Sequence, residues 1–227
     1  MKRFLIIAAA MLAAAGCGRK DSVVMAEKSS NDSICSINIA YPVFSSTSAS
    51  VNAKFGKLNS AIETYVDTVG RNAYSQAEEL MADIAGMADS PAGLPDWNCE
   101  LLIESSAFLS ERMASVLFTT YSYLGGAHGM TEYKAVNFDI RSGEILGNEQ
   151  LLDYSKTDRI NELLENGFEN PDGCFWEKPS LDKASAIVME EDAVKFIYEQ
   201  YVLGPYSCGA AEVTIPVAKL DGLLLVK

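Results

Sequence analysis

The sequence predicts an α+β fold in which helices pack on a largely antiparallel sheet. Apolar residues recur at helical spacing over residues 52–69, which indicates an amphipathic helix with one buried face. Three long runs of alternating apolar and polar residues follow, at 97–107, 112–124 and 130–140. With 227 residues, 48% of them hydrophobic, the chain is large enough to bury the core that this arrangement requires.

The N-terminal half begins with a strand and continues with helices. Residues 34–44 alternate in polarity and predict a strand that ends near Pro42. The helix over residues 52–69 comes next, and Gly70 predicts its end. A second helix is expected over residues 73–87, which completes a helical layer on the sheet.

The three alternating runs predict an antiparallel meander whose middle strand, residues 112–124, is central and covered on both faces. Further along, residues 148–168 predict a helix or a broken helix. Residues 186–198 predict a hairpin with an acidic tip at 190–192, and residues 211–215 predict a final strand.

The first sixteen residues have the pattern of a secretory signal peptide. Lys2 and Arg3 precede an apolar run over residues 4–15, and the small residues 14–16 stand directly before Cys17. A run of this length reaches about 18 Å as a helix, well short of the roughly 30 Å hydrocarbon core of a bilayer. We therefore expect residues 1–16 to be removed rather than retained as a membrane span.

Because Cys17 follows the small residues, the segment resembles a bacterial lipobox, whose cysteine is acylated and becomes the mature N-terminus. An ordinary signal peptide with an incidental cysteine is the alternative. Residues 17–33 are polar and without periodicity, and they predict a flexible tether. We expect a lipid-anchored cell-envelope protein, periplasmic or surface-exposed, in the outer rather than the inner membrane, because Gly18 is not an acidic retention signal.

The charge balance limits the classes of partner that the protein is expected to bind. The chain has 31 acidic and 18 basic residues, a formal charge of −13, and loss of Lys2 and Arg3 takes it to −15. So acidic a surface cannot neutralise phosphates, which argues against nucleic-acid binding. His128 is the single histidine, which excludes the common His-rich zinc sites, and we expect no metal or cofactor. A negative potential does accelerate encounter with cationic proteins.

Four cysteines remain besides Cys17, an even number that suits disulfides in an oxidising compartment. They allow three pairings, and we favour Cys174 with Cys208 and Cys35 with Cys99. Four buried free thiols are the alternative. A zinc site is disfavoured because the cysteines are not clustered.

Three motifs occur in order along the chain. They are Gly125-Gly126-Ala127-His128-Gly129 after a Tyr-rich strand, the strand and turn over residues 138–143, and residues 201–206 followed by Gly209, Val213, Ile215, Pro216 and Leu220. Together they resemble the paired bacterial domains of unknown function found in the extracellular part of the anti-sigma factor RsiV. The non-catalytic N-terminal region of the peptidoglycan deacetylase PdaC is similar in part. The likeness spans about residues 34–221, with subdomains at 34–124 and 125–227 forming one compact unit.

The resemblance implies a receptor function, because the RsiV-like domain binds host-type lysozyme and this binding leads to proteolysis of the anti-sigma factor. We expect no anti-sigma signalling, since no sigma-binding segment or spanning helix precedes the domain, and no deacetylase module. Val202 stands where the family pattern has an acidic residue, so a contact made by that carboxylate in relatives is not expected here. No lysozyme-contacting residue is carried over, because the motifs that align are structural.

The candidate recognition residues lie in the first and third motifs, and both loops are expected either to contact a ligand or to serve the fold alone. They are Gly125, Gly126, His128, Gly129, Tyr201, Pro205 and Tyr206. The glycines permit a tight connection between strands. His128 is either a general base or pH-sensitive contact, or a structural imidazole.

A glycan hydrolase needs only two carboxylic acids, and Asp139 with Glu144 is the nearest pair. Asp139 precedes a turn, however, where aspartate ordinarily accepts bonds from local backbone amides. We therefore expect a non-catalytic lipoprotein that binds a cationic protein such as lysozyme, or a cell-wall component such as peptidoglycan. A cell-wall hydrolase and a structural lipoprotein without a discrete ligand are the alternatives.

Overall fold

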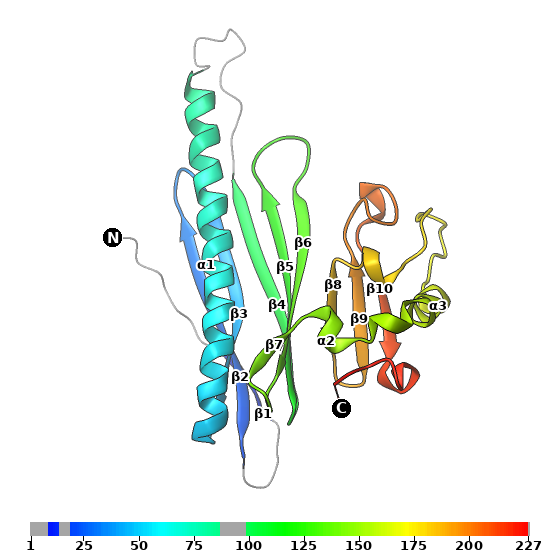
Figure 1. Ribbon diagram of the computed structural model, residues 1–227. Helices are drawn as coiled ribbons and strands as arrows, with labels where there is room; N and C mark the ends of the chain where they lie inside the picture. The colour runs from blue at the N-terminus through cyan, green and yellow to red at the C-terminus, as the bar shows by residue number, and fades with distance from the viewer. Residues whose placement is uncertain (1–8, 14–18, 87–98, 227) are drawn as a thin grey trace.

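The computed structural model describes residues 9–13, 19–86 and 99–226, and it confirms the α+β class. Two lobes follow one another along the chain (Figure 1). The N-terminal lobe is a seven-stranded sheet with the long helix α1 on one face, and the C-terminal lobe is a three-stranded sheet with short helices. Each lobe has its own cluster of buried apolar side chains.

The large sheet keeps its strands in chain order, and its predicted meander is confirmed. All neighbouring strands are antiparallel except β3 and β4, which are parallel because the chain passes through α1 between them. The strands are β1 (Ala9–Ala13), β2 (Asp21–Asn31), β3 (Ser36–Ser46), β4 (Glu100–Leu109), β5 (Met113–Tyr123), β6 (Met130–Asp139) and β7 (Glu144–Leu146). Residues 97 and 98 of the first predicted run lie outside the described residues.

Helix α1 (Ala49–Gly86) is one continuous element, so the predicted break at Gly70 and the separate second helix are wrong. Its buried stripe continues past the glycine to Ala73 and Ala77. A glycine inside a helix costs about 1 kcal/mol relative to alanine. At Gly70, however, the missing side chain lets the helix lie close to β3, where an added Cβ would be 3.4 Å from Ile39 Cδ1. Packing on the sheet therefore overrides the local propensity.

Strand β2 occupies most of the predicted flexible tether, so that prediction is wrong for residues 21–31. Val23 and Ala26 are buried in the core, and every residue of β2 pairs with β3. Strand β3 also continues beyond Pro42, its expected end. The proline is tolerated because pairing between β3 and β4 stops at Ile39, so the missing N–H removes no bond to β4.

The C-terminal lobe begins with short helices and ends with a small sheet in the order β10-β9-β8. The predicted broken helix is confirmed as α2 (Asn148–Leu151), a 3₁₀ turn (Tyr154–Lys156) and α3 (Thr157–Gly167). The predicted hairpin is β8 (Ala186–Met189) with β9 (Ala193–Tyr198), and the last strand is β10 (Ala211–Pro216). Further 3₁₀ turns cover Leu181–Lys183, Tyr206–Cys208 and Val217–Leu220.

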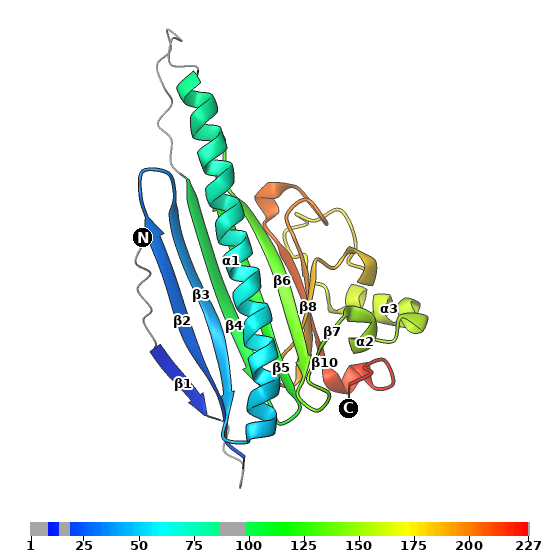
Figure 2. The same ribbon diagram turned by 60° about the vertical axis from the view of Figure 1, so that its left-hand side comes forward.

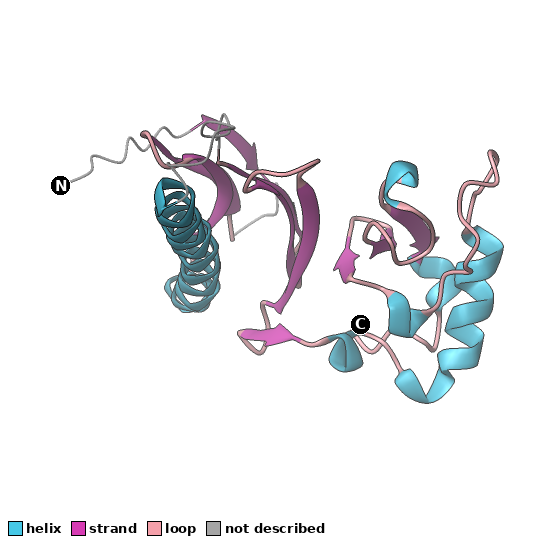
Figure 3. Ribbon diagram, turned by 90° about the horizontal axis from the view of Figure 1, so that it is seen from above, coloured by secondary structure: helices cyan, strands magenta, loops and turns pink. Residues whose placement is uncertain are grey.

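The lobes meet on the face of the sheet opposite α1, as the view from above shows (Figure 3). On β5, Ala114 belongs to the core under α1, whereas its neighbour Met113 belongs to the core of the C-terminal lobe. The buried side chain of Asn137 on β6 donates to the Ile187 carbonyl at 2.8 Å and accepts from the Met189 amide at 3.0 Å. The side-chain amide of Asn137 thus links β6 to β8 by two hydrogen bonds, although these strands belong to different sheets.

The boundary between the lobes falls between β7 and α2, and the predicted boundary at residues 124/125 is wrong. Strands β5 and β6 lie on either side of that position and pair from Met113 with Asp139 to Ser122 with Met130. A division there would separate two hydrogen-bonded neighbours of one sheet.

Strand β1 lies within the predicted signal peptide and pairs with the outer edge of β2. The predicted acylation site, Cys17, lies outside the described residues. No helix in the described part of the chain is long and apolar enough to cross a membrane. Removal of residues 1–16, which the signal-peptide pattern predicts, would leave β2 as the edge of the sheet.

Candidate functional site

The two predicted recognition loops lie against each other, although one belongs to each lobe. The loop between β5 and β6 carries His128, and the loop after β9 carries Tyr206. Their rings stack with centroids 3.9 Å apart and planes at 22°. Both loops lie at the same end of the molecule, near the top of Figures 1 and 2.

Two side chains converge on the backbone carbonyl of Gly129. The Tyr206 hydroxyl donates to this oxygen at 2.8 Å, and His128 Nδ1 lies 3.0 Å from it. A carbonyl oxygen only accepts, so the second contact requires the proton on Nδ1. In neutral His128 the other ring nitrogen, Nε2, is then an acceptor on an exposed side chain.

The glycines of the first loop serve it in two ways. Gly126 has φ of +103°, which residues with a side chain rarely adopt, and its carbonyl accepts from the Tyr123 hydroxyl at 3.0 Å. Gly125 also has a positive φ. At Gly129 the reason is space, because an added Cβ would lie 2.4 Å from the Tyr121 ring. The tyrosines of β5 therefore hold the loop that follows them.

Tyr201 extends the stack, with its ring centroid 5.8 Å from that of Tyr206. It is 59% exposed and is the one non-glycine residue with positive φ in the described ranges, at +69°. The left-handed region costs a residue with a side chain about 1–2 kcal/mol. Pro205 stands directly before the 3₁₀ turn that carries Tyr206, and its carbonyl accepts from the Cys208 amide at 3.0 Å.

The two favoured cysteine pairs are joined as disulfides, Cys35–Cys99 and Cys174–Cys208. The second bridge ties the loop of Tyr206 to the segment before Trp176. The amide of Trp176 donates to the Leu203 carbonyl at 3.1 Å, which fastens the two segments a second time.

Two further exposed apolar side chains lie on segments joined to these loops. Trp176 is 72% exposed, and Met130, directly after Gly129, is 39% exposed. We call His128, Met130, Trp176, Tyr201 and Tyr206 the aromatic cluster. The candidate residues named from the motifs did not include Met130 and Trp176. Trp176 stands two residues after Cys174, so the favoured disulfide was the signal that could have placed it near Tyr206.

The ionisable groups of Glu199 and Tyr133 serve the fold. Glu199 Oε1 accepts from the Tyr133 amide at 2.8 Å, which connects the end of β9 to β6. Burial raises the pKa of the Tyr133 phenol, and Glu212 and Glu199 raise it further. The phenol is therefore protonated at neutral pH. Within the described residues no three His, Cys, Asp or Glu side chains are grouped to hold a metal ion.

The carboxylate pair considered for hydrolysis lies elsewhere. Asp139 and Glu144 are paired residues of the β6–β7 hairpin, at the opposite end of β6 from His128. Asp139 Oδ1 accepts from the Arg141 amide at 2.8 Å, as expected for an aspartate that begins a turn. The structure therefore does not bring these carboxylates to the recognition loops.

A groove of about 540 Å³ runs between α1 and strands β2 and β3, with Ile39 and Gly70 among its lining residues. Lys28 Nζ lies in it, 2.8 Å from Asp67 and 5.1 Å from the centroid of the Tyr41 ring. Burial lowers the pKa of Lys28, but the bond to Asp67 and the neighbouring acidic groups raise it above its ordinary value overall. This ammonium is thus engaged within the fold.

Comparison with known families shows that the chain is similar to two of them, one in each part of the sequence. Two family models match the chain in tandem: Deacetylase PdaC over residues 28–131, and a family of proteins of unknown function, DUF3298, over residues 144–218. The gap at residues 132–143 lies close to the observed lobe boundary. The two matches, in this order along the chain, agree with the resemblance to paired domains that the three motifs predicted.

Two solved structures of DUF3298 family proteins share the fold. One from Bacteroides fragilis has a TM-score of 0.60 and 17% identity, covering 91% of this chain and 94% of its own. The other, from Pseudomonas aeruginosa, has a TM-score of 0.56 and 17% identity, covering 97% of this chain and 94% of its own. No protein with a curated description matches the sequence.

Proposed function

We propose that the protein is a lipid-anchored cell-envelope module that binds a cationic protein, with lysozyme-like proteins as the foremost candidates, and that the aromatic cluster is its recognition surface. One observation carries the proposal: Trp176, Tyr201 and Met130 are exposed on the segments that carry or adjoin the His128–Tyr206 stack. Tryptophan, tyrosine and methionine are enriched at protein interfaces, where a few such side chains supply most of the binding energy.

The charge supports a cationic partner. At −15 after loss of Lys2 and Arg3, the chain attracts basic proteins, and salt weakens that attraction. The strained backbone of Tyr201 supports the choice of surface, because strain at an exposed side chain is typical of functional sites. A cell-wall glycan is the second ligand class that exposed aromatic rings suit.

Binding of a cationic lysozyme to the purified chain tests the proposal. We expect measurable affinity at low ionic strength that falls as salt is added. Trp176→Ala and Tyr201→Gly should each weaken binding about tenfold, in the range of an interface hot spot. Tyr201→Gly also relieves the left-handed backbone, so loss of stability does not explain its effect.

Ile145→Ala is the matched control, because Ile145 is 46% exposed on β7 and lies outside the cluster. It should leave the affinity unchanged within about twofold. Absence of lysozyme binding at every ionic strength rejects the partner, and equal loss in the control rejects the surface.

A further inference from the structure

We infer that one end of the N-terminal lobe is a docking surface for membrane phospholipid headgroups, on which the domain stands upright. This end, called the base, comprises residues 19–21, 46–54, 110–112 and 139–144. The inference rests on the proposed acylation of Cys17 and adds an orientation to it.

The chain between the proposed acylation site, Cys17, and the first residue of the base, Arg19, is very short. Arg19 follows Cys17 by two residues, and its guanidinium donates to the Glu111 carbonyl at 2.6 Å and pairs with Asp21 at 2.7 Å. Two extended residues span at most about 7 Å. An acyl group on Cys17 therefore holds the base against the bilayer surface instead of lifting the domain away from it.

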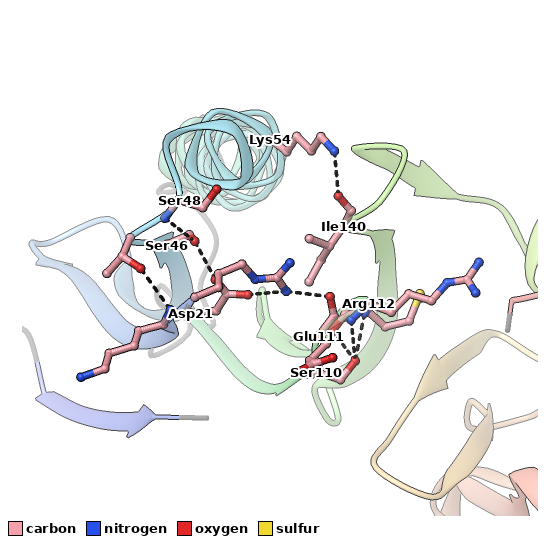
Figure 4. Close-up of polar contacts among 12 residues, drawn as sticks. Asp21, Ser46, Ser48, Lys54, Ser110, Glu111, Arg112 and Ile140 are labelled. Atoms are coloured by element: carbon pink, nitrogen blue, oxygen red, sulfur yellow. Dashed lines mark hydrogen bonds and ion pairs between the residues drawn. The ribbon is translucent and has the colours of Figure 1, made fainter. Parts of the chain in front are cut away.

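The segment after Arg19 is fastened to the start of α1, which makes this short connection firm. Lys20 and Thr47 exchange two hydrogen bonds, each 3.0 Å long. Asp21 is 6% exposed, and its carboxylate accepts from the Ser46 hydroxyl at 2.6 Å. Figure 4 shows Asp21 and Ser46 beside the first turn of α1.

The remaining turns of the base are bound to one another. Lys54 Nζ donates to the Ile140 carbonyl at 3.1 Å (Figure 4). It also donates to the Arg141 carbonyl at 2.6 Å. The Ile140 amide donates to the Arg112 carbonyl at 2.7 Å. The base is therefore a preformed surface and not a set of independent loops.

The charge of the base differs from that of the rest of the chain. Its basic side chains are Arg19, Lys20, Lys54, Arg112 and Arg141, and its acidic ones are Asp21, Glu111, Asp139 and Glu144. These sum to +1 on a mature chain of −15. None of the exposed large apolar side chains among the described residues belongs to the base. This end is thus polar and can approach anionic headgroups, whereas the acidic remainder is repelled by them.

The orientation determines where the recognition surface lies. Helix α1 begins at the base and extends away from it for 38 residues (Figures 1 and 2), about 57 Å. The ten residues of β6 separate the base from the loop of His128 by about 30 Å. The aromatic cluster therefore points away from the membrane, where a soluble protein reaches it.

Neutron reflectometry of the acylated full chain on supported bilayers of phosphatidylcholine and phosphatidylglycerol tests this orientation. We expect a protein layer about 55–60 Å thick, directly against the headgroups. Insertion of ten Gly/Ser residues between Gly18 and Arg19 should open a water layer beneath the protein. The double variant Lys20→Glu/Arg141→Glu should tilt the domain and thin the layer.

The matched control is Lys178→Glu/Lys183→Glu, which changes the net charge equally but lies in the C-terminal lobe; it should leave the layer unchanged. An acylated protein that forms a layer of about 30 Å, the distance set by the strand length, or that already floats above a water layer, overturns the docking and leaves the anchor intact. Mass spectrometry that finds no acyl group on Cys17 overturns both.

Discussion

The two lobes reach a fixed structure by different means. In the N-terminal lobe, α1 covers the sheet, and the ring of Phe55 contacts those of Phe44 on β3 and Phe138 on β6. In the C-terminal lobe, the sheet has three strands, and the Cys174–Cys208 bridge closes a long irregular segment. The exposed rings lie on the less regular lobe, and the packed lobe supplies β5, β6 and the base. The candidate recognition residues thus lie on loops, and the sheet beneath holds those loops in position.

The largest expected effect comes from removing a buried ring in either lobe. Phe55 and Phe196 are both fully buried, one in each core. Phe55→Ala and Phe196→Ala should each lower the free energy of unfolding by about 3–5 kcal/mol. Because β5 contributes to both cores, both variants should shift one shared transition in urea denaturation followed by circular dichroism. Two separate transitions would show that the lobes unfold independently.

The next largest effect comes from the two disulfides, one in each lobe, which should differ in how easily they are reduced. Removing either bridge costs about 2–4 kcal/mol, but Cys35 and Cys99 are 1% exposed whereas Cys174 is exposed. Mild reductant should therefore open Cys174–Cys208 first, as read by thiol alkylation and peptide mapping. Lysozyme binding should fall while the far-ultraviolet dichroism is retained, because only the aromatic cluster loosens. Earlier alkylation of Cys35 and Cys99 would reverse this ranking.

The smallest expected difference concerns the joint between the lobes. Ser115 and Asn137 are paired residues on β5 and β6, and both are buried. Asn137→Ala leaves the Met189 amide and the Ile187 carbonyl without their partner and should cost about 1–3 kcal/mol. The Ser115 hydroxyl has no hydrogen-bond partner in the described structure, so Ser115→Ala should be neutral or slightly stabilising. Denaturant titration of the pair compares them, and equal losses would contradict the role given to Asn137.

Several features followed from local patterns and were confirmed. The alternating runs became β4, β5 and β6 because a strand with buried faces needs that period whatever its neighbours are. The hairpin of β8 and β9 and both cysteine pairs also matched. The recognition residues His128 and Tyr206 were named from their motifs, but nothing in either motif stated that the two rings touch.

The errors share a cause. Gly70 has a helix-breaking propensity, yet α1 continues through it because Ile39 of β3 packs against this position. Residues 21–31 look like a polar linker, but pairing with β3 satisfies their backbone and buries Val23 and Ala26. The boundary at residues 124/125 placed a glycine-rich turn between domains, although the turn joins two strands of one sheet.

From its order of residues alone, this chain specifies the period of each strand, the glycine turns, the cysteine count and the negative charge, because each depends on near neighbours or on composition. The tertiary structure alone decides that α1 continues past Gly70, that Asn137 connects β6 to β8, and that the ring of Tyr206 stacks on His128. Those contacts join residues far apart along the chain, and their free energy comes from burial and hydrogen bonding that no local segment can supply.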